Sequence, residues 1–360
     1  MHARHTDNAL CEVARIAASG SWQVVTSRGW IERGLLRHFT KTPVRIVFVS
    51  SHPTLRWANT LTSVTCDGLV AVGGGSVIDG AKALIAAGSL RGETNLLEWI
   101  EAKRGDFKKR DFRFVAIPTT AGSGSEATGT ATLWGDSNPK YSISGSALFP
   151  DDILFDARLC LSVPKKVKAA AGLDAISHAF EAIWNQKATS ISDQHAARSL
   201  ALARTFFEQS LSTRQSEQIT RGMQEAAYQA GLAIGITGTA LAHSISYPLT
   251  STFKIPHGFA CALTLGELIK ILADRHPSRI EFAAAAWGTS VSGLGRSVEK
   301  LIKIHTPPWI VEALNQPVKT DATDLALLDG NRSKNFILRV DESEARQILQ
   351  RAISNLTVNG

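Results

Sequence analysis

Residues 68–79 read GLVAVGGGSVID, a short apolar run followed by three glycines and the start of a helix. Glycines at a strand-to-helix turn allow positive φ angles and let backbone amides approach a phosphate, while the helix N-terminus adds partial positive charge. The stretch therefore predicts a strand, a phosphate-binding loop and a helix, in that order. Three consecutive glycines would also suit a tight turn that binds nothing.

The residues around this loop alternate between strand and helix patterns. Short β-branched runs predict buried strands at 22–26, 44–50, 68–72 and 112–117. Helical patterns, such as 31–39 and 77–87, separate them. Strands separated by helices favour parallel pairing with right-handed crossovers, so we expect a doubly wound, Rossmann-like sheet. The stretch before Trp22 has a helical pattern, and we expect no strand there.

The second half of the chain has a different character, with alanine and leucine dominant. Helices are predicted at 169–185, 192–209, 216–231, 258–272, 297–304 and 342–354. We therefore expect an α/β dinucleotide-binding domain at 1–157 and an all-α domain at 158–360. Chain length agrees with this division, since 360 residues at roughly 150 per domain give about two domains.

Composition and charge exclude several classes of protein. The chain is 44% hydrophobic and 20% charged, which is ordinary for a globular protein and not for a disordered or fibrous one. Its 39 basic and 32 acidic residues give a diffuse net charge of +7. One basic cluster, 103–113, also holds two aspartates. We interpret it as a solvated loop and expect no nucleic-acid partner.

The sequence indicates neither a membrane segment nor a cysteine cluster. No stretch approaches the ~18 apolar residues of a membrane span, and charged residues interrupt the first 22 positions, so we expect a cytoplasmic protein without membrane contact. The cysteines lie far apart with no CxxC pair, at Cys11, Cys66, Cys160 and Cys261. This argues against a disulfide framework or a cysteine zinc cluster, and we interpret all four as buried small hydrophobic residues.

A second polar turn follows another predicted strand. Residues 118–126 read PTTAGSGSE and come directly after the strand that ends at Ile117. Open α/β sheets bind ligands at the carboxyl ends of their strands. We therefore expect hydroxyls and amides of this turn and of the glycine loop to converge on one ligand.

The end of the first predicted strand bears on the choice of cofactor. A nicotinamide enzyme that prefers NAD usually presents a carboxylate to the ribose 2′-hydroxyl at this point. Here the chain has Ser27 and Arg28. A guanidinium can bind a 2′-phosphate, so we predict NADPH in preference to NADH. The alternative is that Arg28 is a solvent-facing residue at the start of a helix.

Four residues of the second half form a candidate metal site. Asp174 and His178 are four residues apart in a predicted helix, so their side chains share one face. His243 and His257 enclose a segment whose fold-back would bring both imidazoles to a common point. One carboxylate and three imidazoles suit a divalent transition metal such as Fe, Zn, Ni, Cu or Mn. A single histidine in a helix is more often structural, but four candidates together favour a metal site.

These motifs, in this order, resemble the iron-containing (group III) alcohol dehydrogenase family. The resemblance runs from about Val24 to about Leu272. It covers GGGSVID, PTTAGSGSE, Lys140 in NPKYS, Pro150 and Asp156 in FPDDILFD, GLDAISHAFEA at 172–182 and AHSISYPLTSTFKIPHGFACAL at 242–263.

The resemblance implies both an architecture and two sets of site residues. It implies an N-terminal Rossmann-like domain and a C-terminal helical domain for the metal and the substrate. The metal, Fe²⁺ first and otherwise Zn²⁺ or Mn²⁺, would be held by Asp174, His178, His243 and His257. The cofactor site would be lined by Gly74, Gly75, Ser76, Asp79, Thr119, Thr120 and Lys140. A homodimer is a further expectation from the family.

Two departures from the family pattern concern the substrate and the proton. Many members have a histidine where this chain has Tyr247. The run 246–250, after ITGT at 236–239, resembles the phosphonoacetaldehyde reductase branch, which tends to carry a basic residue where this chain has Gly238. An anionic substrate would therefore need another cation. Lys254, Arg332 and Lys334 are the candidates.

The resulting hypothesis is a metal-dependent, NADPH-linked reduction of a small aldehyde to an alcohol. Phosphonoacetaldehyde, reduced to 2-hydroxyethylphosphonate, is the first substrate expected. A general short-chain alcohol or semialdehyde dehydrogenase of the same family is the alternative, and a lyase resembling dehydroquinate synthase is a remote one. Tyr247 is the candidate proton donor, although a tyrosine in this place can equally be a packing residue.

Overall fold

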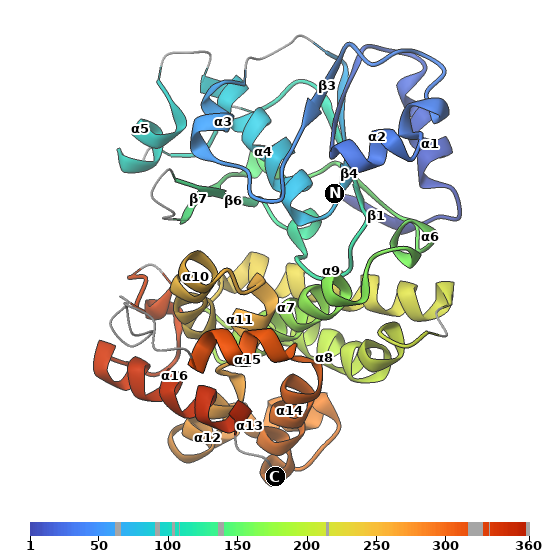
Figure 1. Cartoon of the computed structure of the whole chain (residues 1–360). Helices are drawn as coiled ribbons and strands as arrows, with labels where there is room; N and C mark the ends of the chain where they lie inside the picture. The colour runs from blue at the N-terminus through green and yellow to red at the C-terminus, as the bar shows by residue number, and fades with distance from the viewer. Residues whose placement is uncertain are drawn as a thin grey trace. The chain divides into compact units, whose positions relative to one another are not determined.

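The chain folds into two compact units, each with its own core. The computed structural model describes residues 1–61, 66–90, 94–102, 105–107, 109–135, 140–213, 216–315, 327–330 and 332–357 (Figure 1). Unit 1 comprises 1–162 together with 216–224, and unit 2 comprises 163–215 and 225–360. The boundary expected at 157/158 stays a prediction.

Unit 1 is built on a six-stranded parallel sheet. Its strands are β1 (His2–His5), β2 (Trp22–Thr26), β3 (Arg45–Phe48), β4 (Gly68–Gly73), β5 (Arg113–Pro118) and β8 (Asp152–Phe155), in the order β1-β8-β5-β4-β2-β3. The register aligns Gly73 at the end of β4 with Pro118 at the end of β5. The predicted doubly wound sheet is confirmed, and its carboxyl edge carries both polar turns.

Alternate residues of the strands pack under helices on opposite faces of this sheet. Leu69 and Ala71 of β4 join a core with α3 (Leu55–Asn59) and α4 (Gly75–Leu90). Val70 and Val72 join a core with α1 (Ala9–Ala17). Figure 1 shows α1 and α2 (Arg28–Glu32) on one side of the sheet and α3 and α4 on the other. Both faces are buried, which explains why the strands lack a polar alternation.

Three predictions for unit 1 were wrong. The stretch before Trp22 holds a strand as well as a helix, because the polar segment HARH of β1 pairs along β8 at the sheet edge and needs no apolar side. The helix expected at 31–39 is divided into α2 and the 3₁₀ helix η1 (Leu35–His38) by Gly34, whose φ is 84°. A hairpin of β6 (Thr130–Trp134) and β7 (Lys140–Ser144) was not expected.

Short elements complete the unit: η2 (Ser125–Ala127), η3 (Ser146–Leu148), α5 (Leu96–Glu101) and α6 (Arg158–Leu161).

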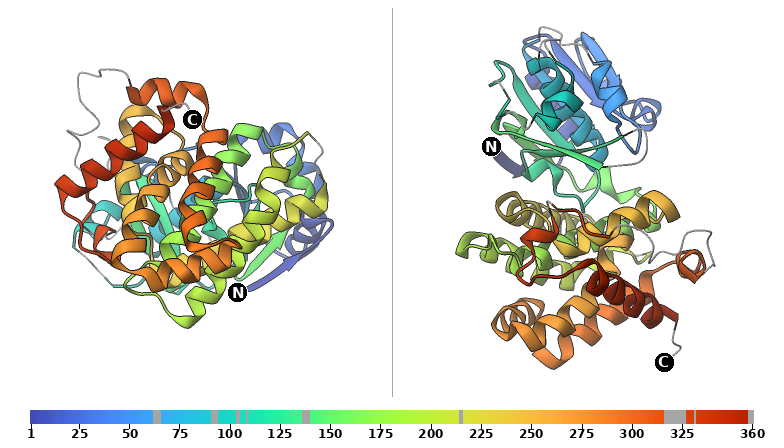
Figure 2. Two further views of the ribbon diagram at one scale, coloured as in Figure 1. Left: turned by 90° about the horizontal axis from the view of Figure 1, so that it is seen from below. Right: turned by 90° about the vertical axis from the view of Figure 1, so that its left-hand side faces the viewer.

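Unit 2 is helical, as predicted. Its described residues form helices and no strand, apart from one isolated bridge between Asn185 and Phe336 (Figure 2). The helices are α7 (Lys165–Ile183), α8 (Ser190–Ser210), α9 (Glu217–Thr237, which begins in unit 1), α10 (Leu241–Phe253), α11 (His257–Ala262), α12 (Leu265–Arg275), α13 (Pro277–Trp287), α14 (Val291–His305), α15 (Pro308–Asn315), η5 (Ser333–Asn335) and α16 (Glu342–Thr357). Where the structure describes helices, none is long and apolar enough to cross a membrane.

The segment that carries the predicted histidines differs from the prediction. The helix expected at 258–272 is two helices, α11 and α12, and α10 was not expected at all. Pro248 lies inside α10. Proline removes a helical hydrogen bond and normally ends a helix, so sequence patterns argue against one here.

Candidate metal centre and cofactor loop

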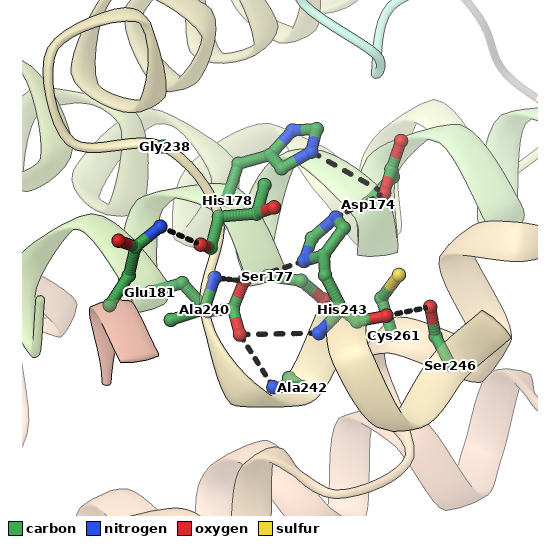
Figure 3. Close-up of polar contacts among 12 residues, drawn as sticks. Asp174, Ser177, His178, Glu181, Gly238, Ala240, Ala242, His243, Ser246 and Cys261 are labelled. Atoms are coloured by element: carbon green, nitrogen blue, oxygen red, sulfur yellow. Dashed lines mark hydrogen bonds and ion pairs between the residues drawn. The ribbon is translucent and has the colours of Figure 1, made fainter. Parts of the chain in front are cut away.

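The metal centre begins with one face of α7. Asp174, His178 and Glu181 lie four and three residues apart, so their side chains project on the same side of the helix. All three are buried. Figure 3 shows them beside the start of α10, with Asp174 next to the imidazoles of His178 and His243.

Glu181 orients His243 and was missed in the sequence. Its carboxylate accepts a hydrogen bond from Nδ1 of His243 at 2.6 Å and from the amides of Ala240 and Ala242 at 2.9 and 2.6 Å. Burial alone would raise the pKa of Glu181, but His243 and these amides lower it below its usual value. The ionised carboxylate can only accept, so Nδ1 of His243 donates and Nε2 is directed to Asp174. The sequence did hold a signal for Glu181, because a residue seven positions after Asp174 in a helix lies on the same face.

Two ligand atoms of this cluster are buried without any hydrogen bond. Oδ1 of Asp174 and Nε2 of His243 form an ion pair at 3.6 Å, and neither has a hydrogen-bond partner. This separation is too long for a hydrogen bond. Atoms that each bind one ion at about 2.0–2.2 Å lie roughly 3–4 Å apart, which is the spacing observed. The residues therefore fit a shared cation.

His178 and His257 complete the predicted ligand set. Nε2 of His178 lies 3.8 Å from Oδ1 of Asp174, and its ring stacks on that of His243 with centroids 4.7 Å apart. The ring of His257 lies edge-on to His243 at 5.3 Å. The structure thus places His178 beside Asp174 and His243, but His178 is outside the group of ligand atoms that lie within 4.8 Å of one another, which includes Asp174, His243 and His257.

The protonation of His178 and Asp174 suits metal binding, whereas His243 must first lose a proton. Burial lowers the pKa of His178 to about 4, so its ring is neutral at physiological pH, as a ligand must be. Burial would raise the pKa of Asp174, but His178 and the other imidazoles hold it well below its usual range. For His243, burial disfavours the charged ring, yet Cys261 and Glu181 raise its pKa well above normal. A metal at Nε2 would displace that proton.

A glycine brings α11 against α7. A Cβ on Gly258 would collide with the carbonyl oxygen of Ala170, so only glycine permits this approach. His257, one residue earlier, is thereby held near Asp174. One turn further along α11, Cys261 is also buried at the cluster. One ligand atom each of Asp174, His243, His257 and Cys261 lie within 4.8 Å of one another.

Tyr247 lies beside this centre, as predicted. Its ring is near-parallel to that of His257, with centroids 5.9 Å apart. The guanidinium of Arg332 lies 4.5 Å from the tyrosine ring centroid and also pairs with Asp329. Burial raises the pKa of Tyr247 to about 12. Lys254 and Lys334, the other candidate cations, are exposed, and Nζ of Lys254 donates to the carbonyl of Ser251 at the end of α10.

In unit 1 the glycine loop and the second polar turn meet. A Cβ on Gly75 would collide with the Ser123 side chain, and one on Gly74 would press on Thr120. The amide of Thr119 donates to the carbonyl of Gly73 at 3.0 Å. Two strand ends are therefore close-packed, as expected, and a side chain at Gly75 would force Ser123 to move.

Several predicted cofactor residues use their side chains inside unit 1. Ser76 Oγ donates to the carbonyl of Ser51 at 2.6 Å. Asp79 accepts from Ser125 Oγ at 2.5 Å and from the amide of Thr132 at 3.0 Å. A phosphate would thus be bound here mainly by loop amides. The cofactor roles of Ser76 and Asp79 stay predictions.

The remaining predicted cofactor residues lie at the edges of this region. Lys140 begins β7, with Nζ 4.7 Å from the ring centroid of Trp134. Ser27 and Arg28 follow β2 directly, and the exposed Arg28 guanidinium lies 5.2 Å from the ring centroid of Phe48. Their roles toward a cofactor also stay predictions.

A buried lysine beneath the loop was missed. Nζ of Lys82 donates to the carbonyls of Ser125 and Thr130 at 2.6 and 2.7 Å, and to the hydroxyls of Ser125 and Thr128. Burial lowers the pKa of Lys82 to about 8 and raises that of Glu126 to about 7. We call Asp79, Lys82, Ser125, Thr128 and Thr130 the lysine network. It fastens α4 to the turn that faces the glycine loop.

Fold and sites together define the class of protein. The family described as iron-containing alcohol dehydrogenase matches residues 8–157, and the C-terminal part of the Fe-containing alcohol dehydrogenase family matches residues 168–306. The chain belongs to the iron-containing alcohol dehydrogenase family, which confirms the resemblance found in the sequence. Members of this family are oxidoreductases that act on alcohols or aldehydes with NAD(P).

Particular relatives are similar over part of their length. Phosphonoacetaldehyde reductase of Streptomyces viridochromogenes is 34% identical over 218 residues, which is 59% of this chain and 55% of the relative. The bifunctional aldehyde-alcohol dehydrogenase AdhE of Escherichia coli is 32% identical over 246 residues, which is 64% of this chain and 27% of the relative. The matched regions thus span about half and about a quarter of these relatives. An iron-containing alcohol dehydrogenase from Thermococcus thioreducens shares the fold, with a TM-score of 0.86 at 22% identity over 98% of both chains.

Proposed function

We propose that this protein reduces a small aldehyde to an alcohol with a reduced nicotinamide cofactor and a divalent metal ion. The observation that carries the proposal is the pair of buried ligand atoms without a hydrogen-bond partner, Asp174 Oδ1 and His243 Nε2, at a separation that suits a shared ion. Membership of the family supports the reaction class.

The chain's own residues would divide the work as follows. When bound, the metal supplies a Lewis acid for the aldehyde oxygen and the nicotinamide supplies the hydride. Glu181 keeps His243 in the tautomer that presents Nε2. The ion would be held by Asp174, His178, His243 and His257. We propose Fe²⁺ first, with Zn²⁺ or Mn²⁺ as alternatives, because a mixed oxygen and imidazole set accepts all three.

Tyr247 would deliver the proton that the reduction consumes. Because its pKa is about 12, the hydroxyl stays protonated at physiological pH and can donate to the oxygen of the forming alcohol. Its ring lies beside His257, which supports a place next to the reacting oxygen. The guanidinium of Arg332 lies over the ring.

NADPH is the proposed cofactor form. The glycine loop at the start of α4 offers backbone amides and a helix N-terminus to the pyrophosphate. Arg28, exposed at the carboxyl end of β2, offers a guanidinium for the 2′-phosphate. Replacing Arg28 by methionine should raise the KM for NADPH and leave the KM for NADH unchanged.

Phosphonoacetaldehyde is the proposed substrate, and Arg332 is the cation that the structure favours for its phosphonate. Arg332 lies over Tyr247, whereas Lys254 and Lys334 are exposed. The similarity to a phosphonoacetaldehyde reductase supports this choice. The alternative is a general short-chain reductase, favoured by Gly238 and by the pairing of Arg332 with Asp329, which partly neutralises it.

A substrate comparison tests both candidates. The chelator-treated protein would be reloaded with Fe²⁺, Zn²⁺ or Mn²⁺ and given phosphonoacetaldehyde, propanal or succinic semialdehyde, with loss of NADPH or NADH absorbance as the readout. The proposal expects NADPH and phosphonoacetaldehyde to be preferred by orders of magnitude in kcat/KM. A preference for propanal would favour the general reductase, and no net oxidation with any aldehyde would exclude both.

Matched variants locate the cation. Arg332→Met should lower kcat/KM for phosphonoacetaldehyde about 10-fold to 100-fold and leave propanal unchanged, because a charged hydrogen bond contributes about 1.5–3 kcal/mol. Lys254→Met and Lys334→Met are the controls. An equal loss for both aldehydes in Arg332→Met would instead indicate that Arg332 only supports Tyr247.

The cytoplasmic location and the homodimer expected from the sequence stay predictions. Sedimentation of the purified chain tests the dimer.

A further inference from the structure

Cys261 lies against the metal centre and not in an apolar core. Its Sγ is 3.5 and 3.6 Å from the two ring nitrogens of His257, one helical turn earlier in α11. The side chain is fully buried. Figure 3 shows its sulfur beside His243 and below Asp174. The four cysteines were predicted to be buried small hydrophobic residues. Burial is confirmed for Cys160 and Cys261, but Cys11 and Cys66 are only half-buried, and the surroundings of Cys261 are polar.

A second buried cysteine shows what a structural thiol looks like in this protein. Cys160 of α6 is as buried as Cys261, but its Sγ lies near the carbonyl of Pro118 at 3.9 Å and the side-chain amide of Gln224 at 3.3 Å. Neither of these partners is an imidazole or a carboxylate, and Cys160 is not part of the cluster of possible metal ligands found among the described residues. Cys261 instead shares its site with a carboxylate and two imidazoles, all within 4.8 Å of its sulfur.

We propose that Cys261 is a further ligand of the metal centre, adding a thiolate sulfur to the oxygen and nitrogen donors already described. The inference rests on the proposed function, because it requires a metal ion at this centre. On binding, the thiol loses its proton to solvent and the sulfur lone pair forms the bond to the ion, so no oxidant or reductant is needed.

A sulfur donor has a chemical consequence that the four other donors lack. Thiolate is a soft ligand that favours Zn²⁺, Co²⁺ and Fe²⁺ over the harder Mn²⁺. We therefore expect Cys261 to bias the centre against Mn²⁺. Because loss of an outer partner of a ligand already costs roughly 10-fold to 100-fold in metal affinity, loss of this direct ligand should weaken Zn²⁺ binding at least about tenfold. Mn²⁺ binding should change far less.

Spectra of the metal-loaded full chain test the proposal without relying on activity. The zinc form should show a sulfur shell at about 2.3 Å in X-ray absorption, beside nitrogen and oxygen at about 2.0–2.2 Å. The cobalt form should show a sulfur-to-metal charge-transfer band in the near ultraviolet in addition to its visible d–d bands. Both measurements on the wild-type chain are independent of whether any variant folds.

Two serine variants assign the sulfur. Cys261→Ser should lose the charge-transfer band and keep the d–d bands, while Cys160→Ser, the matched buried control, should keep both. Stoichiometric d–d bands without a charge-transfer band in the wild type would overturn the role of Cys261 and leave the metal centre standing. No cobalt binding at all would overturn both the inference and the proposed function. A charge-transfer band that survives in Cys261→Ser would also contradict the assignment.

Discussion

Buried polar side chains satisfy one another in the lysine network of unit 1 but not at the metal centre of unit 2. In the lysine network, Nζ of Lys82 meets four oxygens, and both carboxylate oxygens of Asp79 accept a hydrogen bond. At the metal centre, Oδ1 of Asp174 and Nε2 of His243 have no hydrogen-bond partner. In the lysine network each of the polar atoms named has a hydrogen-bond partner, so we call the network closed; it needs no ligand and holds the backbone in place. At the metal centre, a bound ion would give the atoms without hydrogen bonds a partner.

The glycine loop and the metal centre would also bind their ligands in different ways. The glycine loop offers backbone amides, and the side chains around it act as supports. The metal centre offers side chains, and its backbone amides are used by Glu181 to hold α10 in place. We therefore expect substitutions in the lysine network to act mainly on stability, and substitutions at the metal centre to act mainly on metal content and turnover.

The largest effect is expected from Lys82→Met. Removing the ammonium leaves two carbonyls, Asp79 and Glu126 in a buried site without their cation, which should lower the free energy of unfolding by about 3–5 kcal/mol. Urea denaturation measures the free energy of unfolding. The control is Lys41→Met at an exposed position, which should change this free energy by no more than about 0.5 kcal/mol. A loss below 1 kcal/mol would show that the network is not closed as described.

Glu126 should make unit 1 less stable at higher pH. Its folded pKa is about 7 against an unfolded value near 4.5, so the folded state holds the extra proton between these values and stability falls as pH rises through that window. The full effect is about 3 kcal/mol. Glu126→Gln should remove the contribution of Glu126 to this slope, leaving that of Asp79, whose pKa burial also raises, and should raise the urea midpoint at pH 8. An unchanged slope between pH 4.5 and 7 would contradict the assignment.

Tyr247→Phe tests the proton donor. General acid catalysis predicts a loss of roughly 100-fold or more in kcat, with the bound metal unchanged. Stopped-flow or steady-state NADPH oxidation measures it, and elemental analysis provides the control. A loss of less than about threefold would assign Tyr247 a packing role beside His257.

The smallest effect is expected from Glu181→Gln. An amide can still hydrogen-bond to His243 but no longer fixes its tautomer, so metal affinity should fall roughly 10-fold to 100-fold. The chain should remain folded, because the amide oxygen can still accept from the amide of Ala242, so that only the amide of Ala240 loses its acceptor. Competition with a chromophoric chelator measures the affinity. If the metal affinity does not change, Glu181 has only a structural role, like the residues of the lysine network.

Sequence patterns predicted the parts of this protein whose signal is local. The apolar run before the glycines and the spacing of Asp174 and His178 depend on neighbours in the chain, and both were interpreted correctly. Elements held by distant partners were missed. β1 has no apolar pattern because it is held by backbone pairing to β8, and α10 was hidden by Pro248.

The metal centre shows the same limit at the level of single residues. Its four predicted ligands came from spacing and from the family resemblance. Glu181 and Cys261 were not recognised, although each lies at helical spacing from a predicted ligand. Helical spacing places a side chain on a face, but only the packing of α11 on α7 shows that the face of Cys261 meets Asp174.

The central claim is that the candidate metal centre of unit 2 binds one divalent metal ion. Equilibrium dialysis of the chelator-treated chain against Zn²⁺, followed by elemental analysis, tests it most directly. We predict one tightly bound ion per wild-type chain, one in the exposed control Asp274→Asn, and none in Asp174→Asn. A wild-type chain that binds no ion, or an Asp174→Asn chain that still binds one with unchanged affinity, would contradict the account.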